Sequence, residues 1–201
     1  VQDACRAHGT LLIFDEIPTG LGKTGRFFAA EHDGAKPDIV VLGKALGGGI
    51  LPIAACVARD DLNVAGPWAY GHYTHEKNPV TAAAALATLE VIERDGLVEQ
   101  AARVGAHALE RLHALKDRHP LIGDVRGRGL LLGLELVSDR ARKTPAGDAA
   151  EAVLYRALSR GLSFKTTMGN TLTLTPPLIT TREQMDQAID ILDACLADVA
   201  G

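Results

Sequence analysis

The segment that decides the fold is LLIFDEIPTGLGKTG, residues 11–25, in which an apolar run ends at Asp15 and passes into a loop rich in Pro and Gly. Such a run predicts a buried strand, covered on both faces, over residues 11–14. The pattern recurs in IVVLGKALGGG, residues 39–49, where the run ends just before Lys44. Because chemistry gathers at the carboxyl ends of strands in α/β sheets, Asp15 and Lys44 are the first candidates for functional residues.

Strand and helix patterns alternate along the rest of the chain. A third strand-like run covers residues 52–58, and the Ala-rich residues 79–94 predict a helix with Pro in its first turn. After Gly96 the patterns predict helices over residues 97–119, 147–160 and 181–199, a strand or hairpin over 123–137, and short strands over 162–166 and 172–174. The first of these helices carries an apolar stripe of Val98, Ala101, Ala102, Leu109, Leu112 and Leu115.

Length and composition exclude several classes of protein. The chain has 201 residues, is 47% hydrophobic and 23% charged, and carries a formal net charge of −4. Its apolar share is too high for a disordered segment, and no apolar run approaches the roughly 18 residues of a membrane-spanning helix. It has no block of Lys and Arg for nucleic acid or anionic lipid. Three widely spaced cysteines favour a reducing cytoplasm. We therefore expect a cytoplasmic protein whose partners are small molecules or another protein.

Three motifs resemble known nucleotide-binding or metal-binding sites but lack residues that those sites require. Gly-Lys-Thr at residues 22–24 resembles a nucleotide phosphate loop, but Ile17 stands where that loop needs Gly, and a Pro lies inside it. The glycines of residues 127–133 have the wrong spacing for a dinucleotide fingerprint and indicate a turn into a strand. His72 and His75 lack a third ligand at an obvious spacing, so we expect no metal site.

The residue types of Asp15 and Lys44 suit a specific cofactor chemistry. A Lys amine that forms a Schiff base with pyridoxal 5′-phosphate makes this cofactor an electron sink, and a carboxylate paired with the pyridine nitrogen keeps that nitrogen protonated. On spacing alone, the pair also fits an exposed lysine and an aspartate that caps a turn.

Four segments carry a more specific signal: residues 11–55, which hold both candidates, THEKNPVTAAAALATLEVI, GDVRGRGLLLGLEL, and TPPLIT. They resemble the class III aminotransferases of fold type I. The resemblance implies an α/β fold: the end of a large pyridoxal-phosphate-binding domain, with a mostly parallel sheet and helices, over residues 1–95, and a small C-terminal α+β domain over residues 96–201. It covers nearly the whole chain but only the second half of a family member, and the opening residues fit the last turns of a helix that Gly9 ends.

The resemblance also assigns site residues. It makes Lys44 the Schiff-base lysine and Asp15 the partner of the pyridine nitrogen. Ile17 is expected to cover one face of the ring, and Thr74 to reach the cofactor phosphate of the neighbouring subunit in a homodimer. Glu16 matches the second residue of the Asp-Glu pair of the family, and a structural role is the alternative to a functional one.

Three positions depart from the family pattern. Pro18 replaces a Gln that contacts the cofactor ring oxygen, and Lys23 replaces an Arg, which keeps the charge but not the bidentate geometry. Thr173 stands where many members carry the Arg that holds a substrate carboxylate. Arg126 and Arg128 are the nearest candidates to replace that Arg. We therefore expect the cofactor machinery to be retained and the substrate machinery to be altered.

The resemblance implies an aminotransferase of EC 2.6.1 type, which moves an amino group from an amine or amino acid, ω-amino compounds included, to an oxo acid. A lyase, racemase or decarboxylase of the same fold stays open, because all share the cofactor and the lysine. A non-catalytic truncated remnant is the alternative from another class. Since the Gly-rich anion cup of the family is not in this sequence, the isolated fragment is expected to be inactive.

Overall fold

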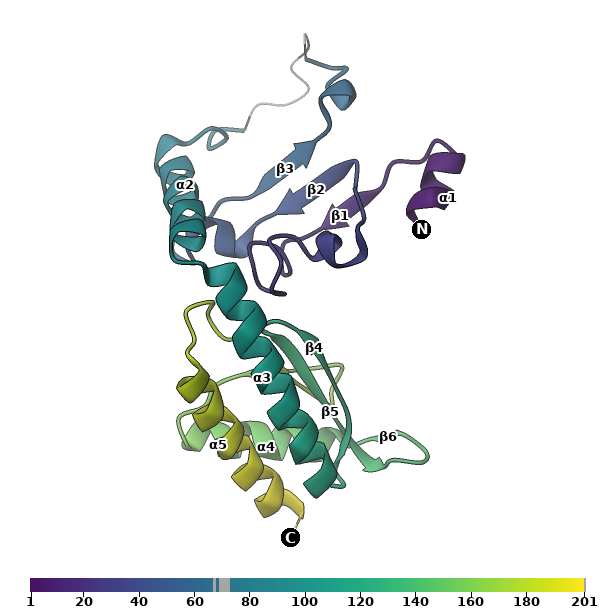
Figure 1. The fold of residues 1–201 in the computed structure, drawn as a ribbon, viewed down its shortest axis with the longest axis vertical. Helices are drawn as coiled ribbons and strands as arrows, with labels where there is room; N and C mark the ends of the chain where they lie inside the picture. Colours follow the sequence, from purple (N-terminus) through teal and green to yellow (C-terminus); the bar gives the residue numbers. More distant parts are fainter. Residues whose placement is uncertain (67, 69–72, 201) are drawn as a thin grey trace. The chain divides into compact units, whose positions relative to one another are not determined.

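The structure, a computed structural model, describes residues 1–66, 68 and 73–200 (Figure 1). It divides into two compact units. Unit 1 comprises Val1–Gly22 and Arg26–Val98, and unit 2 comprises Lys23–Gly25 and Glu99–Gly201. Three residues, Lys23–Gly25, therefore belong to unit 2, although the residues on both sides of them in the sequence belong to unit 1. No pattern in the sequence marks this division.

Unit 1 is built on a three-stranded sheet in the order β1-β2-β3, with β1 at Ile13–Asp15, β2 at Ile39–Leu42 and β3 at Ala55–Ala58. β1 and β2 run parallel, and β3 runs antiparallel to β2. The helical elements of the unit are α1 (Gln2–Ala7), η1 (Ala29–Asp33), η2 (Lys44–Gly47), η3 (Asp60–Leu62) and α2 (Pro79–Arg94). The expected strands and the expected helix over residues 79–94 are confirmed.

Helix α2 begins at a conventional cap and supports the turn after β2. The Asn78 side chain accepts a hydrogen bond from the Val80 amide at 2.9 Å, and Pro79 occupies the first helical position. Gly96, with a positive φ of 60°, follows the end of the helix. α2 contacts η2, and a Cβ on Gly48 would lie 3.1 Å from the Thr88 hydroxyl. The backbone of the turn after Lys44 therefore lies directly on this helix.

The strands of unit 1 are less covered than the apolar runs predict. Leu11, Ile13 and Val57 are 46%, 56% and 56% exposed. Among the residues that the structure describes, unit 1 has one long helix, α2, and its contact with η2 leaves much of the strand faces open. The prediction that these strands are buried on both faces is therefore wrong for this chain.

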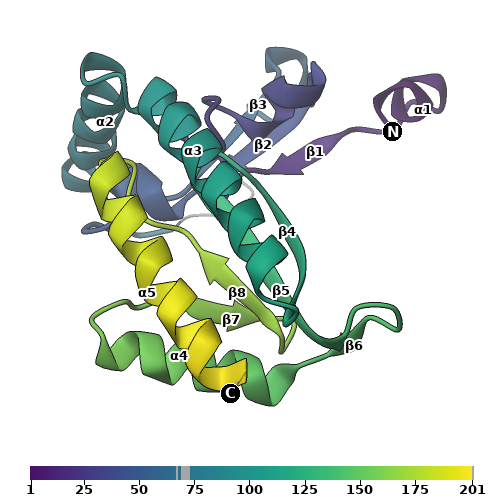
Figure 2. The ribbon, with the colours of Figure 1, turned by 60° about the horizontal axis from the view of Figure 1, so that its bottom comes forward.

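Unit 2 is an antiparallel sheet with helices packed on it. The order is β4-β5-β8-β7, with β6 paired to β5, and the strands are β4 (Ile122–Arg128), β5 (Leu131–Asp139), β6 (Thr144–Pro145), β7 (Lys165–Thr167) and β8 (Thr171–Leu174). The helices are α3 (Leu97–Arg118), α4 (Gly147–Ser159) and α5 (Arg182–Ala200). Figure 2 shows α3 and α5 side by side over the sheet. In the described part of the chain no helix combines the length and the apolar character needed to cross a membrane.

The core of unit 2 lies between these helices and one face of the sheet. Leu132, Leu134 and Leu136 of β5 alternate inward and are at most 1% exposed, as expected for a strand with one buried face. The residues that α3 contributes to this core are Ala101, Val104, Ala108, Leu112 and Leu115. Ala102, assigned to this stripe from the sequence, is exposed instead, because it lies about one residue's rotation (roughly 100°) off the buried face.

Three glycines allow three segments of unit 2 to approach one another closely: Gly25, Gly105 of α3, and Gly129 in the turn of the β4–β5 hairpin. A Cβ on Gly129 would lie 2.6 Å from the Gly25 nitrogen, and one on Gly25 would lie 2.9 Å from the Ala102 Cα. A Cβ on Gly105 would overlap the Gly129 carbonyl. The backbones of Lys23–Gly25, the hairpin turn and α3 are therefore in direct contact.

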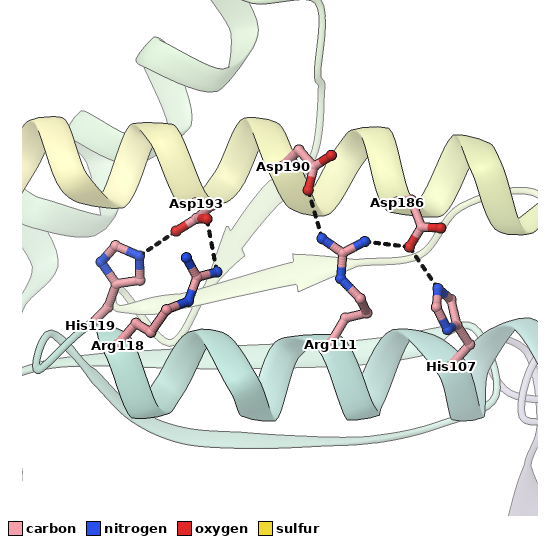
Figure 3. A network of polar contacts seen from close by, with 7 residues as sticks. All are labelled: His107, Arg111, Arg118, His119, Asp186, Asp190 and Asp193. Atoms are coloured by element: carbon pink, nitrogen blue, oxygen red, sulfur yellow. Dashed lines mark hydrogen bonds and ion pairs between the residues drawn. The ribbon is translucent and has the colours of Figure 1, made fainter.

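A ladder of charged side chains joins α3 to α5 (Figure 3). Asp186 accepts hydrogen bonds from His107 and Arg111, both at 2.6 Å, and Arg111 also bonds Asp190 at 2.6 Å. One turn or more away, Arg118 and His119 bond Asp193 at 2.8 and 2.6 Å. The hydrogen bond from His107, and next the one from Arg111, lowers the pKa of Asp186 below its ordinary value.

The ladder predicts a pH-dependent stability. Because the folded-state pKa of Asp186 is lowered, its stabilisation is complete above the ordinary aspartate value of about 3.9 and is lost as the pH falls through the folded pKa. We expect the urea midpoint of the wild type to exceed that of Asp186→Asn at neutral pH and the two to converge below about pH 3.9. Asp190→Asn, at a more exposed position with one partner, is the control and should have a smaller effect. A difference between wild type and Asp186→Asn that stays constant into acid would contradict this.

The glycine contacts predict that Gly129→Ala is far more destabilising than Gly161→Ala. Both glycines have a positive φ, 53° and 86°, but a Cβ on Gly161 would meet nothing within 4 Å. Gly161→Ala should therefore cost about 1 kcal/mol for its backbone conformation alone, and Gly129→Ala about 3 kcal/mol or more through overlap with backbone. Urea unfolding followed by circular dichroism measures both. Equal costs would show that the close approach does not hold this region.

Candidate active site

Asp15 and Lys44 lie at the same end of two paired strands. Asp15 is the last residue of β1 and pairs with Val41 of β2. Lys44 follows Val41 by three residues and opens η2. Because β1 and β2 run parallel, their carboxyl ends meet at one edge of the sheet, where ligands bind in α/β folds. The structure therefore brings the two leading candidates to one edge.

The Asp15 carboxylate is oriented by its own loop. Its Oδ1 accepts a hydrogen bond from the Ile17 amide at 3.0 Å, an arrangement typical of an Asx turn. The side chain is exposed, and Oδ2 has no hydrogen bond among the residues that the structure describes. One oxygen thus fixes the carboxylate, and the other is available to accept a hydrogen bond from a ligand.

Glu16 has a structural role. It is 3% exposed, and its carboxylate accepts hydrogen bonds from the Ala30 amide at 2.8 Å and from the Thr19 hydroxyl. Its backbone amide donates to the Val41 carbonyl at 3.0 Å and so continues the pairing of β1 with β2. Glu16 therefore ties the loop after Asp15 to the sheet and to η1.

Lys44 adopts an unusual backbone conformation. Its φ is +47°, in the left-handed region that costs a non-glycine residue about 1 kcal/mol and that is enriched at functional sites. The turn around it is closed by hydrogen bonds from the Leu46 amide to the Gly43 carbonyl and from the Gly48 amide to the Ala45 carbonyl. The Lys44 side chain is exposed, and within residues 1–66, 68 and 73–200 no hydrogen bond or ion pair engages its amine. That amine is therefore available for a ligand.

Ile17 lies beside the residue that precedes Lys44. A Cβ on Gly43 would be 3.6 Å from two side-chain carbons of Ile17 and 3.8 Å from the Ala54 Cβ. Ile17 thus presents an apolar surface next to the Lys44 turn, while its amide holds Asp15. This position suits a residue that packs against a planar ring, and its contact with the cofactor stays a prediction.

The remaining sequence candidates of unit 1 lie on the surface. Thr74 is exposed in the turn that precedes Asn78, and the role implied for it in a neighbouring subunit stays a prediction. His75 is exposed in the same turn, and His72 lies outside the described residues. Over the described ranges, no three His, Cys, Asp or Glu residues are grouped to hold a metal ion.

Thr173 lies in β8 and faces a polar row across the sheet of unit 2. It pairs with Gly133 of β5 on one side and with Lys165 of β7 on the other. Its hydroxyl is 2.7 Å from that of Thr167. Lys165 is exposed, and no partner for its amine occurs in the described part of the chain. Sequence reasoning missed Thr167 and Lys165, although all three residues of KTT are polar and TLT alternates with the period of a strand that has one polar face.

Arg126 is already engaged by two carboxylates. Its Nη1 donates to Asp124 at 2.8 Å and to Glu135 at 2.7 Å. The same hydrogen bonds, that to Asp124 first, raise the pKa of Arg126. A guanidinium held in this way is a poor replacement for an Arg that must grip a substrate carboxylate.

Comparison with known proteins identifies the family. The model of the aminotransferase class-III family matches residues 1–196. The chain belongs to the class III aminotransferases.

Its relatives within this family have different activities. The chain is 46% identical to a (R)-1-hydroxy-2-aminoethylphosphonate ammonia-lyase of Vibrio splendidus over 99% of its own length and 42% of the relative's. It is also 46% identical to a leucine/methionine racemase of Thermococcus litoralis, over 96% of this chain and 43% of that protein. The chain thus spans less than half the length of these curated relatives.

Solved structures confirm the fold. An amine transaminase from an uncultivated Pseudomonas species, in its pyridoxal-phosphate-bound form, superposes with a TM-score of 0.93 at 32% identity, over 98% of this chain and 46% of that one. The chain is therefore part of a fold type I structure, with a mixed α/β architecture. The expected fold class and family are confirmed.

Proposed function

We propose that the protein to which this chain belongs is a pyridoxal-phosphate-dependent aminotransferase that moves an amino group from an amine or ω-amino compound to an oxo acid. The observation that carries the proposal is the position of Asp15 and Lys44 at the carboxyl ends of two paired parallel strands. In the whole protein, residues 1–95 would end the large domain and residues 96–201 would form the small one. Two subunits would associate so that Thr74 of one reaches the cofactor phosphate of the other.

Family membership implies pyridoxal 5′-phosphate as the cofactor, and the residues present fit it. Lys44 offers an amine without a partner in the described part of the chain, Asp15 an oriented carboxylate with one oxygen available, and Ile17 an apolar surface between them. When bound, the cofactor supplies an electron sink that stabilises negative charge at the amine carbon of the substrate.

The residues of this chain would then have distinct tasks. Asp15 would hold a proton on the pyridine nitrogen through its free oxygen, because an adjacent carboxylate favours the charged form of that nitrogen. Lys44 would link the cofactor covalently until the substrate amine displaces it. The released Lys44 amine would act first as a general base, which takes a proton from the substrate carbon that bears the amino group. It would then act as a general acid, which returns that proton to the cofactor. Ile17 would restrain the tilt of the ring.

A second candidate reaction is elimination of ammonia. The relative that supports it is the ammonia-lyase of an aminoethylphosphonate, which is 46% identical over 99% of this chain. Elimination uses the same lysine and the same carboxylate, and the bond that breaks after deprotonation decides between the two reactions. A leucine/methionine racemase is also among the relatives, so racemisation is a third candidate reaction.

In this proposal, the polar side chains around Thr173 favour a donor whose anionic group lies far from its amine. Thr173 offers a single neutral hydroxyl, already close to Thr167, and Arg126 is engaged by Asp124 and Glu135. Lys165, directly across the strand pair from Thr173, is the exposed cation in this row. A lysine amine on a long flexible stem suits a distal phosphate, phosphonate or carboxylate better than the bidentate grip of an α-carboxylate.

Product analysis tests the proposed function. The full-length protein with pyridoxal phosphate, a candidate ω-amine and an oxo acid should yield the oxo product of the amine and the amino acid of the acceptor, identified by mass spectrometry. Lys44→Ala should abolish turnover, and Asp15→Asn should retain some cofactor but lose most activity. Free ammonia without any need for an oxo acid would establish elimination instead. No product from any amine would favour a non-catalytic protein.

The proposed preference for a donor with a distal anionic group predicts the effect of Thr173→Arg. A guanidinium supplies two parallel charge-assisted hydrogen bonds, so this variant should improve the use of simple α-amino acids by about thirtyfold, equivalent to about 2 kcal/mol. The wild type should prefer the distal-anion donor, and Lys165→Met should weaken that preference. The measurement is kcat/KM for both donor classes in the full-length enzyme. A wild-type preference for a simple α-amino acid that survives mutation of Arg126 and Arg128 would contradict the argument.

A further inference from the structure

The segment Lys23–Gly25, which imitates a phosphate loop in the sequence, is the tip of a closed loop. The base of this loop belongs to unit 1, where the Gly22 amide donates to the Phe27 carbonyl at 3.2 Å. The three residues of the tip belong to unit 2. The loop continues directly from the segment that carries Asp15. The Gly-Lys-Thr-Gly residues are therefore committed to contacts within the protein, which leaves no cradle for a nucleotide phosphate.

The backbone of the tip is fixed within unit 2. The Lys23 carbonyl accepts a hydrogen bond from the Leu130 amide at 2.9 Å, just after the turn of the β4–β5 hairpin. Gly129 of that turn and Ala102 of α3 both contact the tip closely. The tip has little freedom to shift, so the Lys23 side chain starts from a fixed Cα.

The Lys23 side chain reaches a segment far away in the sequence. Its ammonium donates to the Pro176 carbonyl at 2.6 Å. Burial lowers the pKa of Lys23, and no carboxylate in residues 1–66, 68 or 73–200 forms an ion pair with it. A half-buried ammonium without a counter-ion costs free energy. The hydrogen bond from the Lys23 ammonium to the Pro176 carbonyl offsets this cost.

The segment that accepts this bond has few donors of its own. Pro176 and Pro177 lack backbone N–H groups, so the chain between β8 and α5 is short of hydrogen bonds that could hold it. The side chains that bind its carbonyls come from elsewhere: Lys23 bonds Pro176, and the Gln100 amide bonds Leu178 and Thr180, each at 3.2 Å. One backbone hydrogen bond closes the segment, from the Thr180 amide to the Pro177 carbonyl at 3.1 Å, and side-chain donors hold its Pro176, Leu178 and Thr180 carbonyls.

We propose that Lys23 is a positioning residue: its ammonium fixes the Pro176 carbonyl and thereby the end of β8, which carries Thr173. The link to substrate binding rests on the proposed function, in which Thr173 borders the amino donor. Lys23 itself touches neither substrate nor cofactor in this account. One N–H suffices to bind one carbonyl, so an Arg at this position should serve nearly as well, whereas an apolar side chain should release the segment.

Hydrogen exchange measured by mass spectrometry on the full-length protein tests the positioning directly. Lys23→Met should speed exchange of the Thr180 amide, which donates to the Pro177 carbonyl at 3.1 Å, by about tenfold, the effect of one lost hydrogen bond to a charged group, and Lys23→Arg should restore slow exchange. Lys143→Met, at an exposed lysine of unit 2, is the matched control and should change nothing. Where Met hinders folding, Lys23→Gln serves as the second variant, because its shorter polar side chain does not reach Pro176. Unchanged exchange in both variants would overturn the proposal.

Steady-state kinetics test the link to the substrate. Lys23→Met should raise KM for the amino donor several-fold with little change in kcat, and Lys23→Arg should rescue KM. Faster exchange with unaltered KM would confine Lys23 to a structural role and overturn the proposal. A wild type that turns over no amine would refute the proposed function and the substrate link, while the exchange data would still decide whether Lys23 fixes Pro176.

Discussion

The parallel pairing of β1 with β2 is the constraint on which the site depends. Parallel strands end at a common edge, so Asp15 and Lys44, which are separated by 28 residues of intervening chain, are presented together. Glu16 reinforces the pairing with a hydrogen bond to Val41 and with a buried carboxylate that holds η1. The left-handed conformation of Lys44 is tolerated because the turn around it is closed by backbone hydrogen bonds and lies on α2. A slip of one residue in this pairing would turn Asp15 to the other face of the sheet.

The second unit adds close backbone contact at one junction to its packed side-chain core. Gly25, Gly105 and Gly129 allow a loop tip, a helix and a hairpin turn to meet, and the Lys23 ammonium extends that junction to the proline pair after β8. The side chains that determine substrate choice in this account, Thr173 and Lys165, lie on paired strands of the same sheet. Lys23–Gly25 and the strands that carry Thr173 and Lys165 belong to the same unit, so the proposed role of Lys23 stays within that unit.

The sequence was sufficient to predict the strands of unit 1, the long helices, and the position of Asp15 and Lys44 at strand ends, because apolar runs, caps and turn residues are local signals. The two-residue strand β6 was not predicted. It was not sufficient for features that arise from distant segments. Ala102 matched the apolar stripe but is exposed, and Leu11 and Ile13 matched a buried strand although the described part of unit 1 leaves them open. The bond from Lys23 to Pro176 spans 153 residues, and no local pattern in the sequence predicts it. Thr74 depends on a second subunit and stays a prediction.

The central claim is that Lys44, at the edge shared with Asp15, carries the cofactor. The most direct measurement is borohydride reduction of the full-length protein loaded with pyridoxal phosphate, followed by peptide mapping with mass spectrometry. Reduction makes a lysine-bound cofactor permanent, so the account predicts the mass of the reduced cofactor on Lys44 and no labelling of the Lys44→Ala variant. Labelling of Lys23, Lys165 or any other lysine in the wild type, with Lys44 unmodified, would contradict it.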